Sequence, residues 1–524
     1  MKSVNKNLQQ AQPESNSVFS QELCKLFPTP ANSDFHAFVV ESLDLWAQCP
    51  EVRAAVEADL RADALARKHS RERDRQFHFA QTLPLPWAGE AEPVGCSLEL
   101  SPGRPRMSAE LAFLFAMIRG WLGSVCSREA VTFLRESATL EWVLRGRGVN
   151  LPGATTILEN INVLSEATLG LIHRTQLLRA MGEGLEDFRD LSVDSTSVEA
   201  SSRWPTDSSS IERLLERAWR LGRSLDRWGL PAFKSGCAER WLKEIAKLDF
   251  QISTLKEQPG AKRKRRRLYR DLYLTACKMG EKLLGQQREA LKAYSEQAGR
   301  LVPSRREACE AALEQIVEDI SAMGLVLEKS HARIEKGRKT KASERILSLS
   351  DRSAAMIVKG GREPVLGYKA QLARSAGGLV SAVLVEPGNP SDSVMLRPLI
   401  TRGREQTGVT PQSVSADDGY TSGGNLEELE RLGVEQVSFS GAKGKKLLGE
   451  ERWEDPRYEE HRRMRSAVES LMFVLKHNFE FGRMGRRGIE AVRCEMLEKV
   501  LAYNIERIVL LRRRAQAPPG QCAA

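Results

Sequence analysis

The sequence predicts an α/β protein in which two β-rich stretches are separated by a long helical tract. Residues 190–204 alternate apolar and small polar side chains and are rich in β-forming residues. The same strand character returns within residues 345–511, among predicted helices. Residues 205–344, in between, have helical periodicity interrupted by short Gly and Pro turns. We therefore expect a sheet-containing core, built from the two outer stretches, that is split by a helical insertion.

Length and composition predict a multidomain protein with a polyanionic partner. The 524 residues suggest about two to four domains, and the formal net charge of +10 suits DNA or another polyanion. The nine cysteines include no C-x-x-C pair, and no apolar run approaches the roughly 18 residues of a membrane span. We therefore expect a soluble cytoplasmic protein with reduced thiols and no membrane partner.

The region before the first β-rich stretch is predicted to be helical. Residues 1–105 comprise a polar arm, two helical segments and a connection rich in Pro and Gly, which is typical of a linker. Residues 106–189 contain apolar helical segments joined by short turns. This arrangement is typical of helix-turn-helix DNA-binding domains and equally of other small α-domains. At the other end of the chain, residues 512–524 are predicted to form a disordered tail.

Four helices are predicted within the insertion, with breaks at residues 229–231, at residues 259–260 and at Pro303. Helices joined by short turns favour an antiparallel bundle. The densest charge in the chain, KRKRRRLYR, opens the third helix. A face of Lys and Arg can displace the counterions condensed on DNA, and it can equally be a solvated helix side. The residues predicted to contact DNA phosphates here are Lys262, Arg263, Lys264 and Arg265.

Two aspartates lie on predicted strands in the same local pattern. The segments ending at Asp194 and at Asp417 both read Ser, a small or branched apolar residue, then Asp. Strands disfavour Asp, and burying an ionised carboxylate is costly unless a positive group lies beside it. Asp194 is therefore either a functional carboxylate or a cap that accepts hydrogen bonds from the amides of Ser195 or Thr196.

Near the C-terminus, the segment RRMRSAVESLMFVLK predicts one uninterrupted helix from Arg462 to Lys476. At about 100° per residue, a polar stripe places one acid, Glu469, among Arg462, Arg465 and Lys476. A solvated helix side with an Arg465–Glu469 ion pair would have the same pattern. The apolar face beside the stripe consists of Val468, Leu471, Met472, Leu475 and Phe479.

The spacing R-x2-R-x3-E-x6-K of that stripe resembles the Y-x2-R-x3-E-x6-K signature of DDE transposases from bacterial insertion sequences, with Arg462 at the position of the family's Tyr. The D-S-T-x-V-E segment that begins at Asp194, together with the P-T-D-S of residues 205–208, resembles the family's first-aspartate segment. Three further segments resemble its A-D-x-G-Y, G-x-K and G-N-x-x-D motifs. They are Ala416 to Tyr420, Gly367 to Lys369 and Gly388 to Asp392.

The resemblance implies a ribonuclease-H-like catalytic core in which Asp194, Asp417 and Glu469 bind two divalent cations, Mg²⁺ or Mn²⁺. Two such ions, roughly 3.5–4 Å apart, activate an attacking oxygen and stabilise the leaving oxygen. They prefer oxygen ligands, so carboxylates suffice without His or Cys. Gathering three acids without a cation is unfavourable, because like charges raise each other's pKa. The basic residues of the signature are implied to contact DNA.

The activity implied by the resemblance is DNA transposition. The protein would bind the terminal inverted repeats of its mobile element, cleave there with metal ions, and transfer the strand to target DNA, acting as a homodimer or higher oligomer on DNA in the bacterial nucleoid. A structure-specific nuclease or resolvase on the same fold, which cuts without joining, is one alternative. A DNA-binding derivative that has lost catalysis is another, and the presence of all three acids disfavours it.

The neighbouring Asp418 competes with Asp417 for the role of second metal ligand. Side chains alternate along a strand, so Asp194 and Asp417 share a face if their strands are parallel and adjacent, as the resemblance implies. Asp418 would point to the opposite face, before the turn at Gly419, where an Asx-type hydrogen bond is its expected role. The A-D-x-G-Y motif also assigns the acid to Asp417, which we therefore predict to be the ligand.

Overall fold

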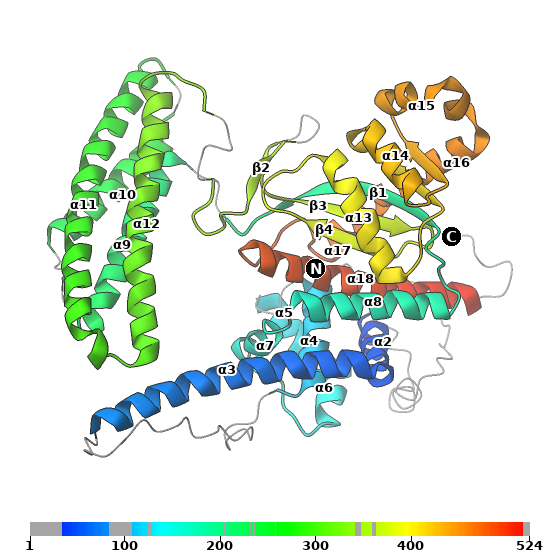
Figure 1. Cartoon of the computed structure of the whole chain (residues 1–524), viewed down its shortest axis with the longest axis horizontal. Helices are drawn as coiled ribbons and strands as arrows, with labels where there is room; N and C mark the ends of the chain where they lie inside the picture. Colours follow the sequence, from blue (N-terminus) through cyan, green and yellow to red (C-terminus); the bar gives the residue numbers. More distant parts are fainter. Residues whose placement is uncertain are drawn as a thin grey trace. The chain divides into compact units, whose positions relative to one another are not determined.

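The computed structural model divides into two compact units, which are described separately (Figure 1). One consists of Met1–Asp63, Gly103–Ser201 and Ser353–Ala524, and the other of Ala64–Pro102 and Ser202–Arg352. The residues that the structure describes are 34–82, 107–123, 128–202, 206–230, 232–233, 236–256, 258–340, 347–358 and 363–516. The polar arm, the Pro- and Gly-rich connection up to residue 106 and the end of the tail after residue 516 lie outside these ranges.

The first unit is built on a six-stranded mixed sheet, which confirms the predicted α/β class. The strand order is β2-β3-β1-β5-β6, and β4 pairs with the same strand β3 as β2 does. The central strand β1 is antiparallel to β3 and parallel to β5, which in turn is parallel to β6. The strands are β1 Asp190–Glu199, β2 Ala355–Ile357, β3 Val365–Ser375, β4 Val380–Val385, β5 Ser413–Ala416 and β6 Gln436–Phe439.

Helices cover both faces of this sheet (Figure 1). On one face, Leu191 and Val193 of β1 share an apolar core with α13 (Asp392–Thr407) and α14 (Gly423–Arg431). The alternating residue Ser192 points to the other face, where its hydroxyl donates to the carbonyl oxygen of Met464 at 3.2 Å. The helices that follow β6 are α15 Ala442–Glu454, α16 Pro456–Met464, α17 Ser466–Asn478 and α18 Ile489–Gln516, and the short helix after β5 is η3 Asp418–Tyr420.

Three helices of the N-terminal region, α2, α4 and α8, pack against α18 within the same unit as the sheet. Arg119 of α4 and Arg486 each donate to the buried carboxylate of Glu498 on α18, both at 2.7 Å. Burial raises the pKa of Glu498 to about 8, and Arg486 acts in the opposite direction. α18 continues through Arg512, where the sequence predicted the start of a disordered tail. The helices of the N-terminal region are α2 Asp34–Gln48, α3 Pro50–Thr82, α4 Ala109–Leu122, α5 Arg128–Glu136, α6 Ala138–Arg145, α7 Ala154–Ile161 and α8 Glu166–Gly182. From Ala64 onward, α3 belongs to the second unit.

The second unit contains the four helices predicted for the insertion, packed around one apolar core. A capping box at Thr206 starts the first of them. Across the core, Arg217 donates to the fully buried carboxylate of Asp319 at 2.7 Å, which neutralises that charge. The helices are α9 Asp207–Arg227, α10 Cys237–Ser253, α11 Ala261–Gln297 and α12 Pro303–Ile334, with the short η1 Ala298–Arg300 between the last two.

The strand character predicted from residue 345 onward is absent from the first described residues of that stretch. The described residues 347–354 form turns, and β2 starts only at Ala355. The hydroxyl of Ser348 accepts a hydrogen bond from the amide of Asp351 at 3.0 Å, which favours a turn over an extended strand. The strand predicted from the alternating apolar pattern of this segment is therefore wrong here, because Leu349 packs against the core of the helical bundle instead of a sheet.

Candidate active site

The parallel strands β1 and β5 place the two candidate aspartates at equivalent positions. Their register pairs Ser192 with Ser415 and Val193 with Ala416, so that Asp194 and Asp417 are the next residues along each strand. The hydroxyl of Ser415 donates to that of Ser192 at 3.1 Å, which shows that these two side chains share a face. The predicted parallel, adjacent arrangement of the two strands is confirmed. Alternation along each strand then directs Asp194 and Asp417 to the same side.

Asp194 is buried, with 7% of its surface exposed. Its Oδ1 accepts a hydrogen bond from the amide of Ser195 at 2.6 Å, the bond expected if the residue were a cap. Its Oδ2 lies 3.7 Å from Nη1 of Arg465, the positive group that a buried carboxylate requires. The strand continues to Glu199, so Asp194 lies within β1 and does not end it.

The prediction of one helix from Arg462 to Lys476 is wrong at Arg465. α16 ends at Met464 and α17 begins at Ser466. At the junction, the amide of Arg465 donates to the carbonyl of Arg462, three residues earlier, at 3.3 Å. The hydroxyl of Ser466 donates to the carbonyl of Arg463 at 2.9 Å. Side-chain competition for backbone acceptors of this kind weakens the regular ladder of a helix.

Arg462 lies on α16, before the junction, and makes contacts of its own. Its guanidinium lies 3.8 Å from the centre of the Trp453 ring and donates to the Trp453 carbonyl at 3.1 Å. A cation stacked on an indole in this way stabilises the fold locally. The contact of Arg462 with DNA stays a prediction.

Arg465 connects Asp194 with the third candidate acid. Its Nη2 lies 2.7 Å from Oε1 of Glu469, one helical turn along α17, while its Nη1 faces Asp194. The Glu469 side chain is 61% exposed, whereas that of Arg465 is 22% exposed. The predicted ion pair between them is therefore present, and it extends to a carboxylate on the central strand. Lys476 lies half-buried two turns further along α17.

The apolar face predicted for this segment is confirmed. The five residues are all buried, and they seat α17 against the sheet. They are Val468, Leu471, Met472, Leu475 and Phe479.

Asp417 and Asp418 have different hydrogen-bond partners. Asp417 directly follows β5, and its Oδ1 accepts from the amide of Gly419 at 2.9 Å. Asp418 instead accepts from the amides of Lys443 at 3.2 Å and Gly444 at 2.9 Å, which are unpaired donors in the first turn of α15. The Asx-type bond expected of Asp418 is thus made by Asp417, and Asp418 caps a helix that the sequence did not predict.

A fourth carboxylate, Asp392 at the start of α13, lies close to this site. Its Oδ1 accepts from Nε2 of Gln371 at 2.9 Å and lies 3.4 Å from Nζ of Lys369. A methyl group added at Gly419 would lie 3.0 Å from Asp417 Oδ1 and 3.1 Å from Asp392 Oδ2, so both carboxylates flank that glycine. The motifs that resemble G-x-K and G-N-x-x-D contain Lys369 and Asp392, so the sequence held this signal although the site was predicted without them.

Tyr420 lies within the electrostatic influence of three of the carboxylates. Its hydroxyl donates to Oε1 of Gln371, which connects η3 to β3. Burial raises the pKa of Tyr420, and the carboxylates of Asp392, Asp194 and Asp417 raise it further. The phenol therefore stays protonated and can hold Gln371 in the orientation that donates to Asp392.

The donor set suits a hard divalent cation, although the acids are not gathered around one point. Within the described ranges, no group of three or more His, Cys, Asp or Glu side chains is close enough to hold a metal. The guanidinium of Arg465 lies between Asp194 and Glu469 and neutralises both. Carboxylate oxygens are the ligands that Mg²⁺ prefers. A cation that engaged both acids would take over the role of Arg465.

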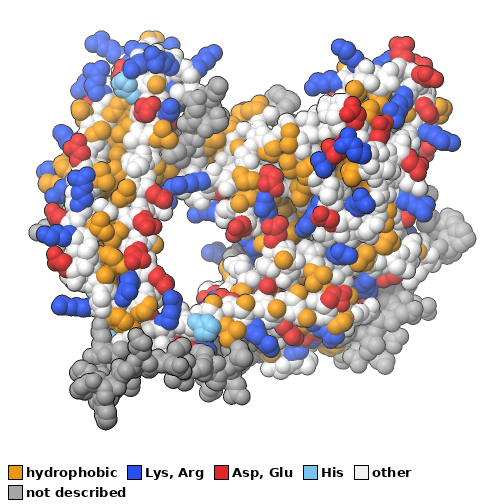
Figure 2. Space-filling model, in the orientation of Figure 1, with side chains coloured by type: hydrophobic (Ala, Val, Ile, Leu, Met, Phe, Trp, Pro, Cys, Tyr) orange, Lys and Arg blue, Asp and Glu red, His pale blue; other side chains and the backbone are white. Residues whose placement is uncertain are grey.

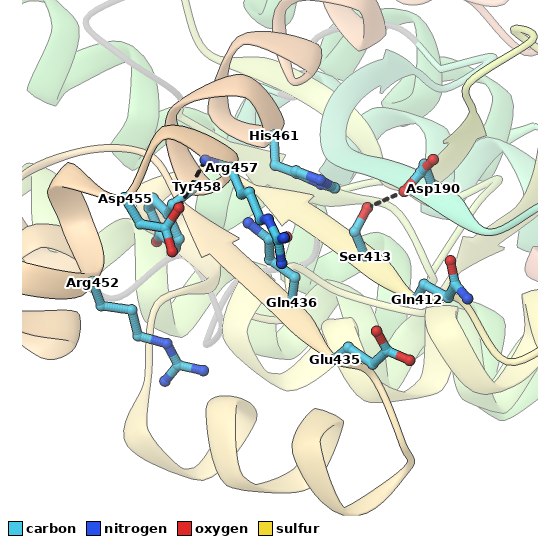
Figure 3. Close-up of a pocket in the computed structure, with 10 residues that line it drawn as sticks. All are labelled: Asp190, Gln412, Ser413, Glu435, Gln436, Arg452, Asp455, Arg457, Tyr458 and His461. Atoms are coloured by element: carbon cyan, nitrogen blue, oxygen red, sulfur yellow. Dashed lines mark hydrogen bonds between the residues drawn. The ribbon is translucent and has the colours of Figure 1, made fainter.

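A polar pocket of ≈ 330 Å³ lies at the opposite end of the parallel strands. It is lined by the first residues of three strands, Asp190, Ser413 and Gln436. Figure 3 shows the 2.6 Å hydrogen bond from Ser413 to Asp190 on one side and Asp455 beside Arg457 on the other. Asp190 precedes Asp194 by four residues, or about 13 Å of strand. The pocket is therefore separate from the acid site, and its lining mixes both charges.

The predicted basic residues of the insertion lie in the second unit. Lys262, Arg263 and Lys264 are exposed and Arg265 is half-buried, all in the first turns of α11. Figure 2 shows Lys and Arg side chains gathered at this end of the bundle.

The fold and the site define an α/β protein with carboxylates where two parallel strands of a mixed sheet end. Residues 349–505 match the family model described as a transposase DDE domain. This part of the chain is therefore a DDE transposase domain, which confirms the predicted resemblance to DDE transposases. The origin in a bacterial insertion sequence and the exact signature stay predictions. The match includes Asp392, Asp417 and Glu469 and begins after Asp194. Neither the curated proteins nor the solved structures that were compared include a match to the chain. Among the described helices, none has the length and apolar character to cross a membrane.

Proposed function

We propose that the protein is a transposase that binds the ends of its mobile element and catalyses metal-dependent DNA cleavage and strand transfer. The observation that carries this proposal is the register of β1 and β5, which sets Asp194 beside Asp417 in the sheet. The link from Asp194 through Arg465 to Glu469 adds the third acid of the signature. The transposase DDE match over residues 349–505 supports the same activity.

In this proposal, Asp194, Asp417 and Glu469 hold two divalent cations, Mg²⁺ or Mn²⁺. The ions would supply an activated nucleophilic oxygen and stabilise charge on the leaving oxygen. The protein's own part is to hold the carboxylates and to place cations near the phosphate. Arg465, released from Asp194, and Lys476 on the same helix would contact the phosphates beside the scissile bond. Asp392, fixed by Lys369 and Gln371, would keep the turn that carries Asp417 in place.

The rest of the chain is assigned to DNA recognition. The mixed sheet, with antiparallel β3 and β4 on one side of β1 and parallel β5 and β6 on the other, supports a ribonuclease-H-like core. We assign element-end recognition to the helices of residues 106–189 and phosphate contacts to the basic start of α11. The protein would act on DNA as a homodimer or higher oligomer.

The proposal is tested with a DNA fragment that carries the inverted repeats flanking the gene. We expect the full chain to nick this fragment in Mg²⁺ or Mn²⁺, to stop when a chelator removes the ion, and to resume when the ion is restored. The same reaction, supplied with a target plasmid, should yield joined products, which a nuclease or resolvase would not form. Cleavage that continues in excess chelator would contradict the proposal.

A further inference from the structure

The end of the bundle where α11 begins and α12 ends carries an unusual density of positive charge (Figure 2). We call the following residues the bundle-end surface. They are Lys262, Arg263, Lys264, Arg265, Arg266, Arg267 and Arg270 of α11, with Lys336, Arg338 and Lys339 after α12. The two groups are about 70 positions apart in the sequence, so the sequence alone does not show that they lie at the same end of the bundle.

Direct contacts hold the two segments together. Nε of Arg266 donates to the carbonyl of Ile334, the last residue of α12, at 3.1 Å. Nη2 of Arg270 lies 3.8 Å from Oε1 of Glu335. Beyond them, Gly337 has a φ of 64°, and the amide of Arg338 bonds back to the carbonyl of Ala332 at 3.0 Å. This is the backbone geometry that closes many helix C-termini, so the backbone that carries the three cations after α12 has a defined turn at this end of the bundle.

The positive charge lies at the end of α11 where the helix dipole disfavours it. A helix N-terminus carries a partial positive charge, which favours acids there and disfavours cations. The first turn of α11 contains no acid, and its first ten residues include seven cations. Like charges three and four positions apart on a helix also repel one another. The arrangement therefore lowers the stability of the free protein, and an anionic partner would relieve it.

The composition of the surface indicates what kind of anion fits. The aromatic residue within the basic run, Tyr269, is 6% exposed and belongs to the bundle core, so it cannot stack on a base. Proteins that bind single strands combine such cations with exposed aromatic side chains. From Lys262 to Arg270 the run extends about 12 Å at 1.5 Å per residue, which is about the width of the DNA major groove. Cations at its two ends can therefore approach phosphates on both strands.

We propose that the bundle-end surface binds the phosphate backbone of duplex DNA without reading its sequence. The proposal deepens the proposed function, on which it rests for the choice of DNA as the polyanion. It assigns Lys336, Arg338 and Lys339 to DNA binding together with the start of α11. Affinity from such contacts depends steeply on salt, because each neutralised phosphate releases counterions.

The test compares two triple variants of the full chain by fluorescence anisotropy on a duplex of unrelated sequence, in chelator so that no cleavage occurs. Replacing Lys336, Arg338 and Lys339 by Gln should reduce the slope of log K against log salt by about 2.7, or 0.9 for each lost phosphate contact. The control replaces Arg288, Lys292 and Arg300, exposed cations elsewhere on α11 and η1, by Gln. It removes the same net charge and should change the slope by less than about one.

Three outcomes would overturn the inference. The first is an equal change in both variants, which would mean that only net charge matters. The second is an unchanged slope in the Lys336 variant. The third is tighter binding of single-stranded DNA or of an RNA duplex than of the DNA duplex. Because binding is measured without metal, a negative result here would not count against metal-dependent nicking of element ends. Conversely, a failure of nicking would not prevent this comparison of binding slopes.

A second measurement separates the electrostatic argument from binding. Replacing Lys262, Arg263, Lys264 and Arg265 by Gln should raise the melting temperature of the free protein at low salt, because the repulsion at the helix N-terminus is relieved. Added duplex DNA should raise the melting temperature of the wild type more than that of this variant. A variant that melts below the wild type at low salt would contradict the argument.

Discussion

Asp417→Ala is expected to abolish DNA cleavage, whereas Asp418→Ala is expected to lower stability and leave most cleavage intact. Asp417 directly follows β5, just as Asp194 follows Val193, the residue of β1 that pairs with Ala416. Removing its carboxylate would remove a shared cation ligand and several kcal/mol of charge stabilisation on the reacting phosphate. A loss of about 4 kcal/mol corresponds to about a thousandfold in rate.

The expected cost at Asp418 is of a different kind. Its carboxylate accepts from two amides in the first turn of α15. Loss of such a cap costs about 1 kcal/mol of stability, which a thermal melt would detect. Asp418→Asn, which retains an acceptor oxygen, should recover most of that loss. If Asp418→Ala is inactive while Asp417→Ala still cuts, the assignment of the second ligand is wrong.

Asp194→Asn should separate chemistry from binding. The amide keeps the shape of the side chain and an oxygen that can accept from Ser195, but it removes the charge that faces Arg465. We expect the rate of cleavage of element-end DNA to fall by about a thousandfold or more, because the loss of about 4 kcal/mol of charge stabilisation has that effect. Binding of the same DNA, followed by anisotropy, should survive with its steep salt dependence.

Asp190→Asn is the matched control for that experiment. Asp190 begins the same strand, at the end that lines the separate polar pocket, and its carboxylate accepts from Ser413. The control should leave both cleavage and DNA binding near wild type. Equal losses of cleavage in the two variants would indicate a general effect on β1 and would count against a catalytic role for Asp194.

The strand arrangement could be predicted from the sequence because it depends on local patterns that tertiary structure reinforces. Alternation in the segments before Asp194 and Asp417 set which side chains share a face, and the resemblance implied that the strands are parallel and adjacent. The register confirms both. The buried face of α17 was predicted for the same reason, since its apolar residues repeat with helical spacing.

The details that the sequence did not predict depend on contacts between distant residues. The junction at Arg465 falls within a continuous helical pattern, and the contact of its guanidinium with Asp194 on β1 adds to the predicted pair with Glu469. Asp418 caps α15, a helix more than twenty residues away. Asp392 reaches the site through Gln371 of another strand. Periodicity carries no information about such partners, because each depends on how separate elements pack.

The most direct test is Mn²⁺ anomalous diffraction from crystals of the full chain bound to its element-end DNA. The account predicts anomalous peaks ligated by Asp194, Asp417 and Glu469, next to the scissile phosphate, with the Arg465 guanidinium moved from Asp194 toward the DNA. Mn²⁺ bound only at other residues, with Arg465 still paired to both Asp194 and Glu469, would contradict the assignment of these three carboxylates as the metal ligands.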